Sequence, residues 1–229
     1  MIILSVHSTT PYLGVAITDG EETLAERIAA PGKHHLENLP GLVSEALSTS
    51  GVTLNQVDAF AAAIGPGSFS GVRIGLAAVK GYCLALKKPV LGVSSLDILI
   101  AQAAYDVDCA FAVIDAGRGD IYTAYATGIS RQGVVVDTPV MASIADFPAL
   151  VRRMTSGVPV ICGASIIGKL GLDSDTADLR LVEAPFPSVC GLIAHRRLMN
   201  SDVDDHLLLT PIYMRKSDAE EKKSSASVV

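Results

Sequence analysis

The sequence predicts an α/β fold made of two successive blocks, each with strands before helices. The 229-residue chain is 49% hydrophobic but only 5% aromatic, and it contains no tryptophan. Its core must therefore consist of Ala, Val, Ile and Leu, a composition that suits sheets covered by helices. Short β-branched runs alternate with segments of helical period, and the order of strands followed by helices occurs twice, with a join near residues 104–108.

The first block opens with an antiparallel ribbon of three expected strands. They are MIILSV (1–6), YLGVAITDG (12–20) and ETLAERIAA (22–30), separated by turn-rich segments. The segment 34–50 changes to a helical period, with Asn38 as a possible N-cap and Gly51 as a plausible stop. The rest of the block alternates between strands at 57–64 and 89–94 and helices at 72–86 and 95–104.

The second block begins with an expected hairpin around the turn Gly-Arg-Gly. Its strands are CAFAVIDA (109–116) and DIYTAYATG (120–128), and GVVVDTPVMA (133–142) follows as one further strand. A helix over 143–154 with Ser143 as candidate cap, a strand over 158–163 and a helix over 188–200 complete it. We expect lobes over residues 1–104 and 105–216 and a disordered polar tail over 217–229.

Composition and charge favour a soluble cytoplasmic protein. The formal net charge of −6 opposes nucleic-acid binding by this chain alone. The cysteines, Cys83, Cys109, Cys162 and Cys190, are widely spread, and none has the spacing of a zinc site. The N-terminus does not resemble a signal peptide, and no apolar run reaches the length expected of a membrane span.

The stretch AAIGPGSFSGVRIG (62–75) lies between an expected strand and an expected helix. Its glycines, Gly65, Gly67 and Gly71, have the spacing GxGxxxG, one residue longer than a dinucleotide loop, and no Lys–Ser/Thr pair of a P-loop follows. The position before a helix is right for binding an anion, but the spacing favours a structural turn. Arg73, in the first helical turn, should have an acidic or phosphate partner.

Other candidate sites are weaker. GASIIGKL (163–170) matches GxxxxGK after a strand, but Leu170 replaces the hydroxyl that would hold Mg²⁺. Asp115, Arg118 and Asp120 surround the hairpin turn, where they either bind a ligand or hold the turn. The vicinal pair His34 and His35 is a poor metal site, and the sequence shows no defined nucleophile–base pair.

A longer stretch, IGPGSFSGVRIGLAAVKGYCLAL (64–86), resembles the signature of the TsaB (YeaZ) family. Four other segments resemble the family in the same order: HHLENLPGLVSEAL (34–47), PVLGVSSLDILIAQA (89–103), VIDAGRGDIYTAYA (113–126) and TPIYMRKSDAE (210–220). The resemblance implies an ASKHA fold, actin-like and ribonuclease H-like, with two similar lobes. Each lobe would have a mixed sheet flanked by helices.

The resemblance also implies a function. The chain would be a non-catalytic partner subunit in forming N6-threonylcarbamoyladenosine beside the anticodon of tRNAs that read ANN codons. It would bind and activate a TsaD-like transferase, associate with a TsaE-like ATPase, form a homodimer without its partner, and meet tRNA only through the complex. ATP or ADP and a metal ion are expected on the partner subunits and not on this chain.

The family comparison bears on metal chemistry. TsaD carries a metal-binding His-x-x-x-His, and Ser95 and Leu99 occupy the two matching places here. A serine hydroxyl is a poor ligand and leucine is none, so the transferase metal site cannot form. The sequence departs from the TsaB pattern at His7, where the family has Asp, and at Gly117, where it often has Arg.

The two long helices of the first block, over 36–50 and 71–86, are the expected partner interface. The interface residues are Leu36, Leu39, Val43, Leu47, Val72, Arg73, Gly75, Leu76, Val79, Tyr82 and Cys83. The expected loop-shaping residues are Gly65, Pro66, Gly67, Ser68 and Gly71. Two alternatives stay open: the apolar faces are only core, or the chain is an ASKHA-type ATP-binding small-molecule kinase.

Overall fold

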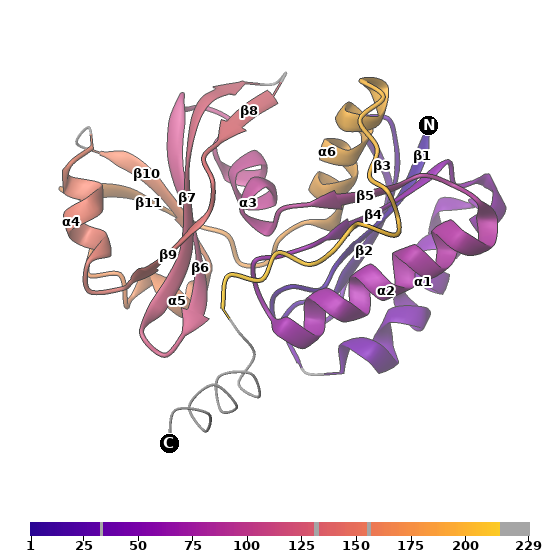
Figure 1. Cartoon of the computed structure of the whole chain (residues 1–229), viewed down its shortest axis with the longest axis horizontal. Coiled ribbons are helices and arrows are strands. Elements are labelled where there is room, and N and C mark those ends of the chain that lie inside the picture. Colours follow the sequence, from indigo (N-terminus) through magenta and orange to yellow (C-terminus); the bar gives the residue numbers. More distant parts are fainter. Residues whose placement is uncertain (33, 131–132, 155–156, 216–229) are drawn as a thin grey trace.

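The computed structural model describes residues 1–32, 34–130, 133–154 and 157–215, and the tail expected over 217–229 lies outside them. Two sheets stand side by side with helices on their faces (Figure 1). The first sheet contains β1 (Ile2–His7), β2 (Gly14–Asp19), β3 (Glu22–Ile28), β4 (Ala59–Ala63) and β5 (Val90–Val93). Its strand order is β3-β2-β1-β4-β5, antiparallel among the first three and parallel from β1 to β5.

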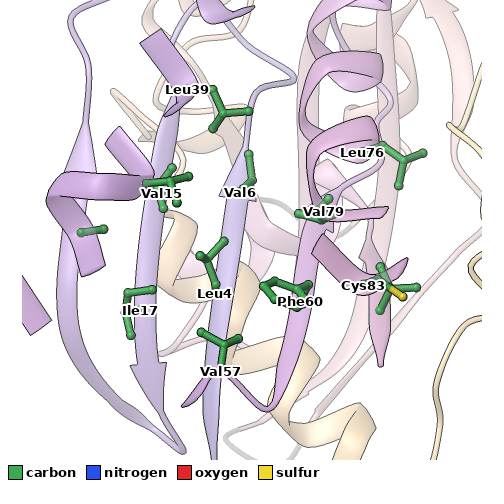
Figure 2. Packing of buried hydrophobic residues seen from close by; sticks show 14 of the residues in the cluster. Leu4, Val6, Val15, Ile17, Leu39, Val57, Phe60, Leu76, Val79 and Cys83 are labelled. Atoms are coloured by element: carbon green, nitrogen blue, oxygen red, sulfur yellow. The ribbon is translucent and has the colours of Figure 1, made fainter. Parts of the chain in front are cut away.

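Helices cover both faces of the first sheet. α1 (His35–Ser50) and α2 (Phe69–Leu86) pack on one face, where Leu4, Val6 and Phe60 of the sheet meet Leu39 and Val79 of the helices (Figure 2). Successive residues of a strand point to opposite faces, so Ile3 lies on the other side. There it packs with α6 (Pro187–Met199), the last helix of the chain.

The second sheet follows the same plan. Its strands are β6 (Cys109–Gly117), β7 (Asp120–Ser130), β8 (Gly133–Val136), β9 (Val140–Ser143), β10 (Val158–Cys162) and β11 (Ala177–Leu181). Their order is β11-β10-β6-β7-β8, with β9 paired to β7. Phe111 and Val113 pack with α4 (Phe147–Arg152) and α5 (Ala164–Ile167). Ala110 and Ala112 pack on the opposite face with α3 (Ser95–Ala103).

The two halves of the chain exchange helices. α3 follows β5 of the first sheet but packs on the second through Leu96, Leu99 and Ile100. α6 follows β11 of the second sheet but packs on the first through Cys190 and Ala194. These two helices therefore pack across the expected division at residue 104. We use "first lobe" for the first sheet with α1, α2 and α6, and "second lobe" for the second sheet with α3, α4 and α5.

Several local expectations need correction. Asn38 lies inside α1, whose start at His35 has no side-chain cap, whereas Gly51 ends the helix in the left-handed region with φ 68°. The expected strand over 133–142 is two strands, β8 and β9. Ser143 is the last residue of β9 and does not cap a helix. α4 starts later, at Phe147, with Pro148 in its first turn.

Length and composition also mislead about α2. Its 18 residues have a mean hydropathy of 1.3 and would be long enough to cross a membrane, contrary to the expectation from the sequence. The helix instead packs on the first sheet through residues such as Val72, Leu76 and Val79. A third of its residues are buried within this chain, others are half-buried, and the exposed positions include Ala77, Gly81 and Leu84.

Candidate functional site

The glycine loop before α2 is shaped by the residues that follow β1. Ser68 caps α2 by accepting a hydrogen bond from the Gly71 backbone N–H at 3.2 Å, and its own N–H donates to the Thr9 carbonyl at 2.7 Å. A Cβ atom on Gly67 would lie 2.3 Å from the Thr9 oxygen, and one on Gly71 would lie 2.0 Å from the Ser8 oxygen. Glycine is required there because the backbone of residues 8–9 touches the loop.

The small residues of α2 face this same turn and not another helix. A Cβ atom on Gly75 would lie 2.3 Å from the Ser8 hydroxyl, whereas one on Gly81 would meet nothing within 4 Å. The Ser8 hydroxyl also donates to the Gly71 carbonyl at 2.8 Å. The loop is thus a strand-to-helix junction held by hydrogen bonds to residues 8–9, as its spacing favoured. The backbone of residues 8–9 lies against its glycines, on the side where a phosphate would otherwise approach them.

Arg73 has an aromatic partner. Its guanidinium lies 3.8 Å from the ring centroid of Phe69, and its Nε donates to the Tyr213 hydroxyl at 2.6 Å. Within the described part of the chain these aromatic groups, and not an acidic side chain, are the partners found for Arg73. Cation–π contact stabilises the guanidinium without a counter-charge. The sequence could not show this contact, because Tyr213 lies 140 residues away.

A buried polar cluster lies under the loop. The Thr9 hydroxyl is 2.8 Å from the Ser95 hydroxyl and 3.1 Å from His7 Nε2, and all three residues are almost fully buried. The pKa of His7 is lowered to about 4. Burial is the main cause, because it penalises the charged imidazole, and the positive charge of nearby His35 adds to the shift. His7 is therefore neutral at physiological pH, and its Nδ1 has no hydrogen-bond partner within the described residues.

A cleft of about 940 Å³ lies between the lobes, with Leu99 on its wall. Its lining comes from residues 9–12 and 67–71 of the first lobe and from 113–115 and 163–166 of the second. The carboxylates of Asp115 and Glu183 line it, and no Lys or Arg is among the described residues that do. Proteins bind triphosphates with cations and free backbone N–H groups, and the charged groups among the described lining residues are these carboxylates.

The lysine of GASIIGKL points to a carboxylate. Lys169 Nζ lies 3.0 Å from Asp115 Oδ2, and Asp115 also accepts from the Gly117 N–H at 2.7 Å. Asp120, at the other end of the hairpin turn, pairs with Arg215. These groups hold the turn and its neighbours together, which is the structural one of the two expected roles.

Comparison with known proteins decides the family. The family profile described as "TsaD: tRNA N6-adenosine threonylcarbamoyltransferase" matches residues 22–161. The "tRNA threonylcarbamoyladenosine biosynthesis protein TsaB" of Bacillus subtilis is 31% identical over 156 residues, which cover 67% of this chain and 67% of that protein. The protein of the same name from Escherichia coli is 37% identical over 127 residues, 54% of each chain. The chain belongs to the TsaB (YeaZ) family.

A solved structure gives the fold of the TsaB family independently. YeaZ from Pseudomonas aeruginosa superposes with a TM-score of 0.77 at 22% identity, covering 93% of this chain and 99% of that one. The expected two-lobed ASKHA-type fold is confirmed. Chain length varies among relatives: a Mycobacterium leprae protein named as uncharacterized is 31% identical over 222 residues, and this chain spans 56% of it.

In this TsaB-family chain the two positions that match the TsaD metal histidines are built into the core. Ser95 is 1% exposed and bonded to Thr9, and Leu99 is 4% exposed and packs on the second sheet. Across the described residues, no group of three or more His, Cys, Asp or Glu side chains is placed to hold a metal ion.

Burial divides the expected interface residues of this TsaB-family chain into two groups. Leu39, Val43, Val72, Gly75, Leu76, Val79 and Cys83 are buried in the first lobe. These seven residues pack in the core of the first lobe, which agrees with the alternative that the apolar faces are core. Leu36, at 71% exposed, and Arg73 remain on the surface, and Leu47 and Tyr82 are half-buried. Leu84, 58% exposed on the outer face of α2, was missed.

Proposed function

We propose that this chain is the non-catalytic partner subunit of the bacterial complex that forms N6-threonylcarbamoyladenosine in tRNAs that read ANN codons. In this role it binds and activates a TsaD-like transferase. Membership of the TsaB family supports the pathway, because relatives of that name are described as threonylcarbamoyladenosine biosynthesis proteins. The observation that carries the partner role is α2, which is apolar enough for a membrane yet only one-third buried.

An apolar helix face that the chain leaves exposed is the physical signature of a partner surface. On α2 the outer face includes Ala77, Gly81 and Leu84 together with Arg73, and Leu36 is exposed at the start of α1. Small residues let a partner helix approach closely, and the exposed leucines would be desolvated on binding. We place the TsaD-like subunit on this outer face, and a second copy of the chain occupies it when that subunit is absent.

We further propose that this chain holds neither nucleotide nor metal by itself, so that ATP or ADP and the metal ion belong to the TsaD-like and TsaE-like subunits. The cleft lining supports this, since its charged groups include two carboxylates and, among the described residues, no Lys or Arg. The neutral, buried His7 supports it as well, because it stands where ASKHA kinases place an Asp that helps hold metal. Contact with tRNA then comes only through the complex, in the cytoplasm.

The interface is tested by one substitution on each side of the molecule. Leu84→Arg places a charge on the outer face of α2, and Leu181→Arg makes the same change at a 54%-exposed position on β11 of the second lobe. We expect Leu84→Arg to weaken binding of the chain's own TsaD by at least about tenfold in isothermal titration, as hot-spot losses do. Leu181→Arg should bind like the parent, and equal affinity of both variants would refute this face.

The function itself is tested by reconstitution of tRNA modification with the TsaD and TsaE proteins of the same organism. Threonylcarbamoyladenosine should form only when this chain is present, and formation without it would refute the proposed role. The kinase alternative is tested separately by titrating ATP with Mg²⁺ into the pure chain. Tight binding with hydrolysis would favour a kinase, and the cleft charge predicts neither.

A further inference from the structure

The last described segment of the chain connects the two lobes. After α6 it runs along the first lobe and then reaches the second (Figure 1). Asp204 forms an isolated antiparallel bridge with Val90 of β5, and the Ile212 N–H donates to the Ile64 carbonyl at 2.8 Å. We call residues 211–215, which complete the crossing, the clasp.

The clasp is anchored on the first lobe by Tyr213. Its ring packs on Phe69 with 4.9 Å between centroids, and its hydroxyl accepts from Arg73 Nε at 2.6 Å. Phe69 and Arg73 belong to the first turns of α2, directly beside Ser68 and Ser70 on the cleft wall. An aromatic pair with a stacked guanidinium is a directional contact worth more than area burial alone.

Arg215 anchors the clasp on the second lobe. Its guanidinium pairs with Asp120 of β7 and donates to the Ala116 carbonyl of β6 at 2.8 Å. The Arg215 side chain is only 16% exposed, so solvent and salt screen this pair less than a typical surface pair. Ala116 follows Asp115, which lines the cleft from the second lobe. Both anchors therefore lie at the rim of the cleft.

Two other chain crossings join the lobes, and both result from the helix exchange. One is the step from β5 to α3, at residues 93–95, and the other is the step from β11 to α6, at residues 182–186. Short connections of this kind act as hinges when two packed bodies rotate. A third connection at the rim of the cleft opposes that rotation, because it ties one wall to the other.

We propose that the clasp sets the angle between the lobes, and with it the width of the cleft. Its release, by loss of either anchor, lets the lobes rotate about the two crossovers. The inference concerns the isolated chain and does not depend on the proposed function. It gives the Pro-x-Tyr-x-Arg segment a mechanical role beside the contacts that already join the lobes, which are the packing of Ile98 of α3 in the core of the first lobe and the Thr9–Ser95 hydrogen bond.

The test measures the distance between the lobes by electron spin resonance. Spin labels are attached at Glu45→Cys on α1 and at Arg153→Cys after α4, two exposed positions on different lobes. The half-buried Cys109 is replaced by Ala to prevent labelling, and the other native cysteines are buried. The parent should give a single narrow distribution of distances.

The ion pair of the clasp is removed by substituting either of its two partners. Arg215→Ala and Asp120→Asn should each broaden the distance distribution by at least about twofold, as expected for a released hinge. Arg196→Ala is the matched control, because Arg196 pairs with Glu21 within the first lobe. Circular dichroism reports whether each variant folds. If Arg215→Ala does not fold, the result for Asp120→Asn decides the outcome.

Two results would overturn the proposal. One is a parent-like distribution in a folded Asp120→Asn variant, which would show that the two crossovers and the α3 packing fix the angle without the clasp. The other is equal broadening in Arg196→Ala, which would show a general loosening of the chain. Tyr213→Phe, which keeps the ring and removes the bond to Arg73, should broaden the distribution less than Arg215→Ala.

Discussion

The buried His7 predicts an acid-sensitive fold. Its pKa is about 4 in the folded chain against 6.5 in the ordinary state, because burial penalises the charged imidazole. The unfolded chain therefore binds a proton more readily than the folded one. Stability contributed by the neutral form is complete above pH 6.5 and is lost progressively as the pH falls toward 4.

The size of the effect follows from the pKa difference. A shift of one unit corresponds to about 1.4 kcal/mol, so the full loss approaches about 3 kcal/mol at pH 4. Between pH 7.5 and 5.5 the same relation gives a loss of about 1 kcal/mol from His7 alone.

Urea unfolding of the parent and of His7→Gln at pH 7.5, 6.5 and 5.5 measures this effect. Gln places an amide near the imidazole Nε2, which contacts the Thr9 hydroxyl, and it does not titrate. We expect the stability difference between the two proteins to shift in favour of the variant by about 1 kcal/mol as the pH falls from 7.5 to 5.5. A difference that is constant across this range would refute the assignment of His7 as a neutral group.

Three further predictions concern α2 and the hairpin. Gly71→Ala should destabilise the chain by at least about 2 kcal/mol in urea unfolding, since its Cβ would meet the Ser8 carbonyl. Gly81→Ala, where the Cβ would enter open space, should stabilise the chain by about 0.5 to 1 kcal/mol. Equal effects of the two changes would contradict the close approach at Gly71. Val79→Arg should unfold the first lobe by circular dichroism, because Val79 is fully buried, and a folded variant that had only lost a partner would support the interface assignment. Lys169→Met should change the free energy of unfolding by less than about 1 kcal/mol, because its pair with Asp115 is exposed, and a larger change would show a structural role for it.

Local signals in the sequence were sufficient for most of the elements. The three opening strands, the stop of α1 at Gly51 and the hairpin around Gly-Arg-Gly follow from side-chain period and turn residues within a few positions. The error over 133–142 has a local cause as well. Pro139 cannot donate to a sheet ladder, so the pairing with β7 is interrupted there, and β8 and β9 run one after the other, antiparallel to β7.

The helix exchange was not predictable from the sequence. α3 and α6 each present one apolar face, and nothing in that face distinguishes the first sheet from the second. The choice is made by distant contacts, such as Ser5 Oγ donating to the Pro187 carbonyl at 2.6 Å across 182 residues. The Arg73–Tyr213 bond has the same character, because its partners are joined only by the complete fold. The sequence pattern shows which side of each helix is apolar, whereas the complete fold determines which sheet that side packs against.

The expected interface residues show the same limit on α2. Val79 and Leu84 are both aliphatic residues of one apolar helix, yet the first is fully buried and the second is 58% exposed. The helical period of α2 marks its inward face through residues such as Val79, but its outer side mixes Leu84 with the polar Arg73, which leaves the role of that side ambiguous. That ambiguity is itself informative, because a soluble lobe needs only one apolar face on α2. The outer face is therefore unexplained by the fold of this chain, and a partner helix is the simplest physical reason for it.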